Sequence, residues 1–281
     1  MERFSSNFNY HTWYEHWHRY YSILNLVKDK SVCDIACGEG YGSALLAKHA
    51  RNVIGIDIDQ KTISNAKNKY QLQTNLEFFQ KNAIKTNIQE NSIDVVVSFE
   101  TIEHLAEHDE LLIEISRILN KDGILIISTP DKDIYSSGNN SHNEYHVKEL
   151  TFNEFKFLIS KHFTFSSYYG QQFRVDSVIE SISHQTVEQQ SINMFCDPNT
   201  KNTLNKNKSD FTYIIAVCSN NKNTSISIAN SSFCDVSNQL FNLYEDQVKK
   251  LAHADSVNQN LKNKITEQST IINHLLSRLG L

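Results

Sequence analysis

The sequence predicts an α/β fold with a doubly wound, mostly parallel sheet of seven strands, followed by a long C-terminal helix. Three observations support this prediction. Short apolar runs alternate with helical patterns from residue 31 to residue 160, a glycine-rich turn follows the first run, and a heptad pattern fills the end of the chain. We expect a domain over residues 1–220 with an insert at about 174–210, a linker at 221–232 and a coiled-coil helix at 233–281.

The predicted elements follow one another in the order that a parallel sheet requires. An aromatic and histidine-rich stretch from His11 to Tyr21 has the spacing of an amphipathic helix. The next strands are expected at Ser31–Ile35, Val53–Asp57, Leu76–Gln80, Ile93–Ser98 and Ile124–Ser128. Helices are expected near Gly42–Lys48, Gln60–Lys69, His108–Leu119 and Phe152–Ser160.

The second half of the chain adds two strands and two polar segments. Phe163–Phe173 and Phe211–Ser219 are rich in aromatic and β-branched residues and are predicted as strands. The polar run Asn199–Ser209 between them is typical of a mobile surface loop. Lys121-Asp-Gly123 predicts a turn before the fifth strand.

The C-terminal segment has alternating steps of four and three between seam residues, which is the signature of a coiled coil. The seam consists of Leu240, Tyr244, Gln247, Leu251, Ala254, Asn258, Leu261, Ile265, Gln268, Ile272, Leu275 and Leu279. We expect this helix to join copies of the chain or to bind a partner protein. The alternative is a long amphipathic helix that packs on its own domain.

Composition limits the kinds of partner and the location. The 281 residues carry a net charge of −5, which gives no general attraction to nucleic acid. Five scattered cysteines do not form a disulfide framework, and no apolar run is long enough for a membrane span. We therefore expect a cytoplasmic protein with no structural zinc finger.

The most informative segment runs from Val32 to Gly42, where a strand ends in an acid and a glycine-rich turn opens a helix. Gly38 and Gly40 permit a close approach of a ligand to the backbone. Asp57, nineteen residues past Gly38, ends the next strand, where a carboxylate can bind both hydroxyls of a ribose. Asp34 lies where it would repel a pyrophosphate and attract an ammonium group, which favours S-adenosylmethionine over a dinucleotide.

This segment resembles motif I of the class I S-adenosylmethionine-dependent methyltransferases, and the resemblance extends from about Arg19 to Phe163. The region of Arg19 is similar to ubiquinone-pathway O-methyltransferases. Glu2-Arg-Phe, His16-Trp-His-Arg-Tyr20 and the string from Asp34 to Ser43 resemble bacterial methyltransferases of surface-polysaccharide assembly. The resemblance implies a Rossmann-like fold and S-adenosylmethionine as cofactor. The residues that it implies for cofactor binding are Arg19, Asp34, Ala36, Cys37, Gly38, Gly40, Asp57, Ile58, Asn82, Ala83 and Phe99.

Within this resemblance each part of the cofactor has its own contacts. Asp34 and the glycine turn line the methionine part, and Arg19 pairs with its carboxylate. Asp57 binds the ribose, Ile58 lies against the adenine, and Asn82 with Ala83 contacts the adenine edge. Phe99 forms part of the pocket floor. An exposed helical arginine is the alternative for Arg19.

A second cluster follows the fourth strand. Glu100, Glu103 and His104 have the spacing of one helix face, where two carboxylates need a proton or a cation between them. His146 follows the fifth strand, whose end lies on the same rim. We expect Glu100, His104 and His146 to be catalytic.

The same cluster resembles the metal site of the small-RNA terminal 2′-O-methyltransferases. The resemblance implies that Glu100, Glu103, His104 and His146 hold Mg²⁺, Mn²⁺ or Zn²⁺. A metal-free general base and a purely structural role are the alternatives.

Together these patterns predict an O-methyltransferase that acts on a sugar hydroxyl of a surface glycan or a nucleotide-sugar. Two other interpretations stay open. One is a metal-dependent RNA 2′-O-methyltransferase, although the negative charge argues against it. The other is a non-catalytic scaffold that binds the cofactor and presents the coiled coil.

Overall fold

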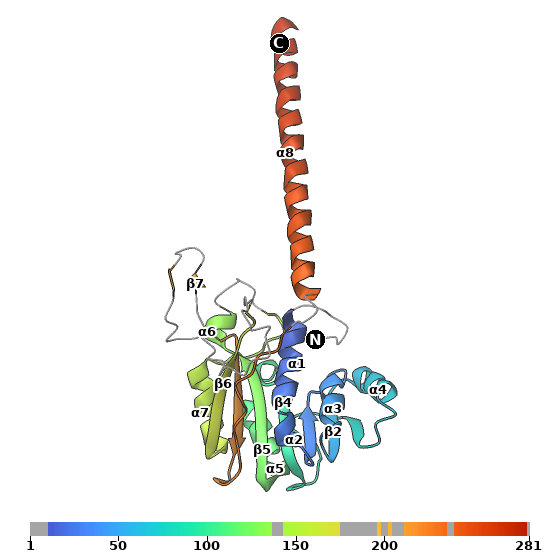
Figure 1. The fold of residues 1–281 in the computed structure, drawn as a ribbon, viewed down its shortest axis with the longest axis vertical. Coiled ribbons are helices and arrows are strands. Elements are labelled where there is room, and N and C mark those ends of the chain that lie inside the picture. The colour runs from blue at the N-terminus through green and yellow to red at the C-terminus, as the bar shows by residue number, and fades with distance from the viewer. Residues whose placement is uncertain are drawn as a thin grey trace, which may run out of the picture. The chain divides into compact units, whose positions relative to one another are not determined.

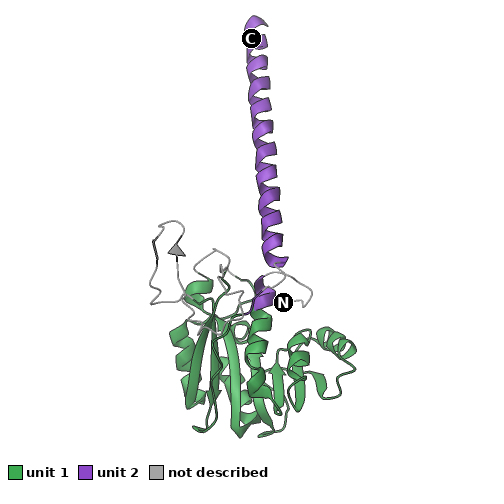
Figure 2. Ribbon diagram, in the orientation of Figure 1, with its two compact units in different colours: residues 1–8, 15–232 green, residues 9–14, 233–281 purple. Residues whose placement is uncertain are grey.

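The computed structural model describes residues 11–136, 143–174, 196–197, 202–203, 211–234 and 239–279. The chain divides into two compact units (Figure 2). The first contains residues 15–232 together with 1–8, and the second contains residues 233–281 together with 9–14.

The first unit is built on one seven-stranded sheet with the order β3-β2-β1-β4-β5-β9-β6 (Figure 1). All neighbours from β3 to β5 are parallel, whereas β9 is antiparallel to both β5 and β6. This confirms the predicted doubly wound, mostly parallel sheet. The strands are β1 Ser31–Ile35, β2 Asn52–Asp57, β3 Leu76–Gln80, β4 Ile93–Phe99, β5 Leu119–Pro130, β6 Phe165–Gln171 and β9 Tyr213–Ser219.

Helices cover both faces of this sheet, so its central strands carry apolar side chains on both sides. Val95 and Val97 of β4 pack into one core with the helices that precede β3, and Val96 packs into the other core with α5 and α7. The helices are α1 His11–Ser22, α2 Leu24–Val27, α3 Tyr41–Leu46, α4 Gln60–Lys69, α5 His108–Ile118, α6 Lys132–Tyr135, α7 Phe152–His162 and α8 Gln239–Leu279.

The predicted turn before the fifth strand takes the form of a bulge. The register between β4 and β5 moves from Ile93 opposite Leu119 to Val95 opposite Ile124. Residues 120–123 therefore have no counterpart on β4, and the Asn120 side chain accepts a hydrogen bond from the backbone N–H of Asp122. Strand β5 thus begins at Leu119, before the segment Lys121–Gly123, where the glycine and the polar residues predict a turn.

Only part of the predicted insert is described. It contains the short antiparallel pair β7 Cys196–Asp197 and β8 Asn202–Thr203. The predicted loop Asn199–Ser209 lies outside the described residues except for Asn202 and Thr203. Residues 221–232, predicted as a linker, have no regular structure, but Ile226 and Ile228 pack against the core that contains Val95.

The second unit consists mainly of α8, which matches the predicted long C-terminal helix. Among the residues that the structure describes, no helix combines the length and the apolar character that a membrane crossing needs.

One prediction concerns Gly40, which precedes α3 with φ of +77° and packs against β3. A Cβ there would lie 2.5 Å from Cζ of Phe78. Gly40→Ala should lower the free energy of unfolding by about 2–5 kcal/mol, since it combines left-handed strain with crowding. Denaturant unfolding of the full chain without cofactor measures this loss.

Gly38→Ala is the matched control. Gly38 has φ of +53°, but a Cβ there would meet nothing within 4 Å, so only the strain of about 1–2 kcal/mol remains. Equal losses in the two variants would contradict the packing argument.

Candidate cofactor and catalytic site

The site lies at the carboxyl edge of the sheet, where the strand order reverses. β1 has β2 on one side and β4 on the other, and all three strands are parallel. The segments that follow them therefore meet at one edge, which is where open α/β sheets bind their ligands.

The turn after β1 is a left-handed segment fixed to β2. Ala36 and Gly38 have φ of 58° and 53°. The backbone N–H of Cys37 donates to the carbonyl of Ile56, and that of Gly38 donates to the Asp57 carboxylate at 3.1 Å. A left-handed alanine is a strained conformation that the surrounding structure maintains. Because a Cβ on Gly38 would meet open space, the turn leaves room for a ligand beside it.

Asp34 lies below this turn and is fully buried. Ser43 donates a hydrogen bond to its carboxylate at 2.6 Å, and the Tyr20 hydroxyl donates at 3.2 Å. Burial raises the pKa of Asp34 to about 7, although these two hydrogen bonds favour the ionised form. A carboxylate in this position is stabilised by a cation beside it.

The residues assigned to the ribose and the adenine follow β2 and β3. The Asp57 carboxylate accepts hydrogen bonds from the backbone N–H groups of Gly38 and Asp59. Ile58 is 52% exposed at the same edge, which suits an apolar contact with a flat ring. Asn82 uses its side-chain oxygen to accept from the N–H of Ile84, and a carbonyl oxygen has a second lone pair for a ligand.

Ala83 and Phe99 are less exposed than Ile58 and Asn82. Ala83 packs against the core that contains α5, and Phe99 at the end of β4 makes an edge contact with Tyr20 at a centroid distance of 5.0 Å. Phe99 thus belongs to the apolar layer beneath the turn.

Arg19 of α1 is buried, with 1% of its surface exposed. Its Nη1 donates to Gln171 at 2.7 Å and lies 3.8 Å from a Glu100 oxygen, while the guanidinium lies over the Tyr213 ring. Its Nε and Nη2 have no hydrogen-bond partner among the described residues. The predicted alternative of an exposed helical arginine is therefore wrong.

The charge of Arg19 is maintained by its neighbours. Burial would lower its pKa, but Glu100, Tyr213 and Glu15 together raise the pKa above the usual value. A buried, charged guanidinium with two unused donors suits a carboxylate that binds both of them. This arrangement and the open space beside Gly38 fit the methionine part of S-adenosylmethionine.

Several neighbours of Arg19 and Asp34 were not predicted as site residues. Gln171 and Tyr213 face each other in the antiparallel register of β6 and β9, which local sequence does not reveal. Tyr20 and Ser43 hold the Asp34 carboxylate. Tyr20 follows Arg19 directly on the same helix, and this position is the sequence feature from which a role at the site could be predicted.

The segment after β4 does not form the predicted helix face. Glu100 has φ of 48°, and a single 3₁₀ turn, η1 Ile102–His104, follows it. Glu100 consequently accepts a hydrogen bond from Ser128 and lies toward Arg19, whereas Glu103 lies beside Thr129. The prediction that Glu100, Glu103 and His104 share a helix face is wrong, because the left-handed residue interrupts the helix.

Glu103, His104 and His146 do come together. Ligand atoms of these three residues lie within 4.8 Å of one another, and the two imidazole rings make an edge contact at 5.0 Å. Burial raises the pKa of Glu103 well above its usual value, and the nearby Glu100 charge adds to this effect. Glu100 lies outside this group of three.

The second ring nitrogen of each histidine has a fixed partner. The Nδ1 atom of His104 donates to the carbonyl of Tyr145 at 2.9 Å, because a carbonyl only accepts. The Nδ1 atom of His146 lies 2.5 Å from a Glu149 carboxylate oxygen. Such partners orient each imidazole, as a metal ligand or a general base requires. The Nε2 atom of His146 lies 3.1 Å from the Asn143 side-chain amide nitrogen, which has to move aside when this nitrogen binds a metal or a proton.

Comparisons with known proteins point to a methyltransferase domain. Residues 33–127 match the Methyltransf_11 family, described as a methyltransferase domain. The chain is 34% identical over 131 residues to the Mycobacterium tuberculosis H37Rv protein named "Probable S-adenosylmethionine-dependent methyltransferase Rv3030", which is 46% of this chain and 47% of that protein. The chain thus spans about half the length of this curated relative.

Two quinone-pathway enzymes are also similar. The Campylobacter jejuni ubiquinone/menaquinone biosynthesis C-methyltransferase UbiE is 34% identical over 37% of this chain and 46% of its own length. The Pelagibacter ubique ubiquinone biosynthesis O-methyltransferase is 30% identical over 39% and 46%.

Among solved structures, a chain of the Haloferax volcanii complex that contains the Trm112 methyltransferase activator has the same fold. Its TM-score is 0.54 at 17% identity, over 75% of this chain and 91% of that one. With the matches above and the sheet that surrounds residues 33–127, this part of the chain is a class I S-adenosylmethionine-dependent methyltransferase domain.

Proposed function

We propose that this chain transfers a methyl group to oxygen, and that the acceptor is a sugar hydroxyl of a surface glycan or a nucleotide-sugar. The observation that supports this proposal is the pair His104 and His146 beside Glu103, with each Nδ1 fixed by a carbonyl or a carboxylate. A hydroxyl must lose its proton when it is methylated, and an oriented imidazole can accept that proton.

In this proposal the chain's own residues align the two reactants. Arg19 binds the methionine carboxylate through Nε and Nη2, Asp34 binds the ammonium group, and Asp57 binds the ribose. The bound cofactor supplies a sulfonium methyl group for in-line transfer. Alignment and removal of one proton are then the main contributions of the protein.

Glu103, His104 and His146 also fit a divalent cation, since one carboxylate and two imidazoles are common ligands of such ions. A cation there would bind a vicinal diol and lower the pKa of the attacking hydroxyl. Glu100, which lies toward Arg19, would have to turn away from Ser128 to join this set. Both forms of the proposal place the acceptor hydroxyl at the same rim.

The first prediction for this site concerns Arg19. Arg19→Lys retains the charge but loses the fork of donors, so the Kd for S-adenosylhomocysteine should rise about 10- to 100-fold, as expected for hydrogen bonds to a charged group. Titration calorimetry measures the change. 5′-Methylthioadenosine lacks the amino acid and should bind both proteins equally, and a parallel loss for it would argue against the carboxylate contact.

The second prediction is a pH dependence of cofactor binding that originates at Asp34. With a pKa near 7 in the free protein, the carboxyl is protonated at low pH and must release its proton to pair with an ammonium group. The Kd for S-adenosylmethionine should therefore be nearly constant from pH 7 to 7.5. It should rise by up to about tenfold per pH unit below pH 7, since one proton is released on binding.

Asp34→Asn is the matched variant for this dependence. It should bind more weakly and lose most of the slope between pH 5.5 and 7.5, because the amide does not titrate. If the slope persists in Asp34→Asn, another group is responsible, and Glu15 beside Arg19 is the next candidate, because burial raises its pKa to about 7 as well.

The third prediction tests the function. With labelled S-adenosylmethionine and nucleotide-sugars or surface-glycan oligosaccharides from the cells that encode it, the full chain should yield a product whose new methyl group NMR places on oxygen. His146→Ala should lower kcat by about 10²- to 10⁴-fold, the range of general-base catalysis. His49→Ala, a change of an exposed histidine outside the site, should leave kcat unchanged.

Two outcomes separate the forms of this proposal. A chelator that abolishes turnover, with recovery on addition of Mg²⁺, Mn²⁺ or Zn²⁺, would favour the metal form, and full activity in excess chelator would favour the general base. A methyl group on carbon would overturn both forms.

A further inference from the structure

The strongest feature that the methyltransferase site does not use is the apolar surface of α8, a helix of 41 residues. Written as heptads with Leu251 at position a, it carries apolar residues at positions a, d, e and g, whereas Ala252 is the sole apolar residue at b, c and f between Gln239 and Leu279. This is a wide, continuous apolar face on an otherwise polar helix.

The first turns of this face are partly covered. Leu240 is buried, and the Tyr244 hydroxyl is hydrogen-bonded to His11 at 3.1 Å. Further along, Leu251, Ile265 and Ile272 are each more than half exposed. The open seam therefore runs from Gln247 to Leu275, too long to be a chance group of surface residues.

We propose that α8 pairs through this seam with the same helix of a second copy of this chain, parallel and in register. The first argument is the position of the polar residues. In that arrangement Gln247, Asn258 and Gln268 each face their own counterpart, so every amide has an amide to hydrogen-bond with.

An antiparallel alignment that places Leu240 opposite Leu279 does not pair the amide side chains with one another. It places Gln247 opposite Ile272 and Asn258 opposite Leu261, and Gln268 then faces Leu251. Each amide would be buried against an aliphatic side chain, which is unfavourable without a hydrogen bond.

The flanking positions are complementary as well. In a parallel pair, position g of one helix lies beside position e of the next heptad on the other helix. Lys250 then lies beside Asp255 of the second copy, Leu243 beside Val248, and Ile271 beside Leu276. None of the g–e pairs from residue 243 to residue 276 joins two like charges.

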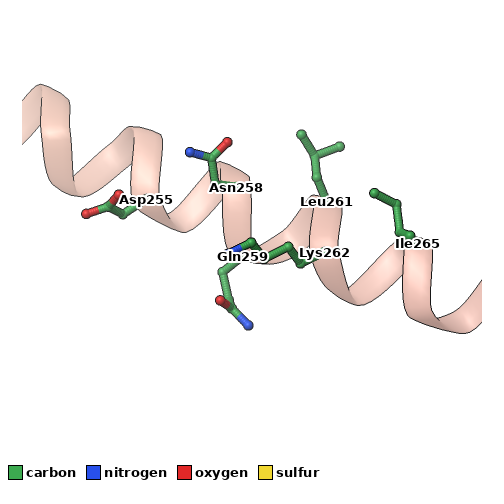
Figure 3. A pocket seen from close by; sticks show the side chains of 6 residues that line it. All are labelled: Asp255, Asn258, Gln259, Leu261, Lys262 and Ile265. Carbon is green, nitrogen blue, oxygen red and sulfur yellow. The ribbon is translucent and has the colours of Figure 1, made fainter.

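The middle of the helix shows the surface that the second copy would cover. Figure 3 shows Asn258, Leu261 and Ile265 projecting to one side of α8, away from Gln259. These three residues lie at positions a, d and a of successive heptads, so they are the side chains that a second helix would contact.

The test uses the full chain with a cysteine at one seam position, in a Cys196→Ser, Cys234→Ser background. Ala254→Cys places the thiols of two parallel, in-register helices opposite each other at position d, within the reach of a disulfide. Mild oxidation should convert most of the protein to a disulfide-linked dimer. Gln259→Cys, on the outer face, should stay mostly unlinked.

Mass in solution gives an independent measurement. The full chain should have at least twice the 32.4 kDa of one chain, and Leu261→Glu with Ile265→Glu should return it to one chain. Asn260→Glu with Asn263→Glu adds the same charges to the outer face and should leave the mass unchanged. A full chain of single mass, a mass unaffected by the seam variant, or Ala254→Cys linking no better than Gln259→Cys would overturn the proposal.

Discussion

A buried guanidinium determines much of the geometry of the methyltransferase unit. Arg19 comes from α1, yet it contacts Gln171 at the end of β6, the Tyr213 ring at the start of β9 and the Glu100 carboxylate after β4. A charge without solvent must be compensated by polar groups around it, so these four segments have to be in place together. The compensation is incomplete, because Nε and Nη2 have no partner among the described residues. The fold thus maintains a cation with two unused donors at the carboxyl edge of the sheet, an arrangement that suits an anionic group of a ligand.

Asp34 is the opposite case at the same edge. Its carboxylate is buried with two hydroxyl donors, and burial raises its pKa to about 7. One site therefore presents a cation that needs an anion and a carboxylate that needs a cation. A zwitterionic amino acid group matches both requirements at once, and a dinucleotide pyrophosphate matches only the first. The pair of charges therefore favours an amino acid group over a pyrophosphate, whereas the glycine turn is shared by both kinds of site.

The sequence predicts those parts of the fold that depend on local periodicity. The strands before residue 100 and the helix at residues 60–69 follow directly from runs of apolar residues and their spacing. The role of Gln171 and Tyr213 depends on the register of two antiparallel strands, which no local pattern encodes. The predicted grouping of Glu100 with Glu103 is wrong for a related reason: their spacing fits a helix, but the left-handed backbone of Glu100 turns its side chain toward Arg19. Three of the four predicted metal ligands thus lie close together, namely Glu103, His104 and His146, whereas the spacing in the sequence does not reveal where Glu100 lies.

The separation of Glu100 from Glu103 has a chemical consequence. Glu100 lies with Arg19, while Glu103 lies with His104 and His146. If both carboxylates faced one point, as a helix would place them, the repulsion between them would need a cation or a shared proton. In the observed arrangement Arg19 compensates one carboxylate, and burial favours a proton on the other, because it raises the pKa of Glu103. The Nδ1 atoms of the two histidines each keep an orienting partner in this arrangement, the carbonyl of Tyr145 and the carboxylate of Glu149.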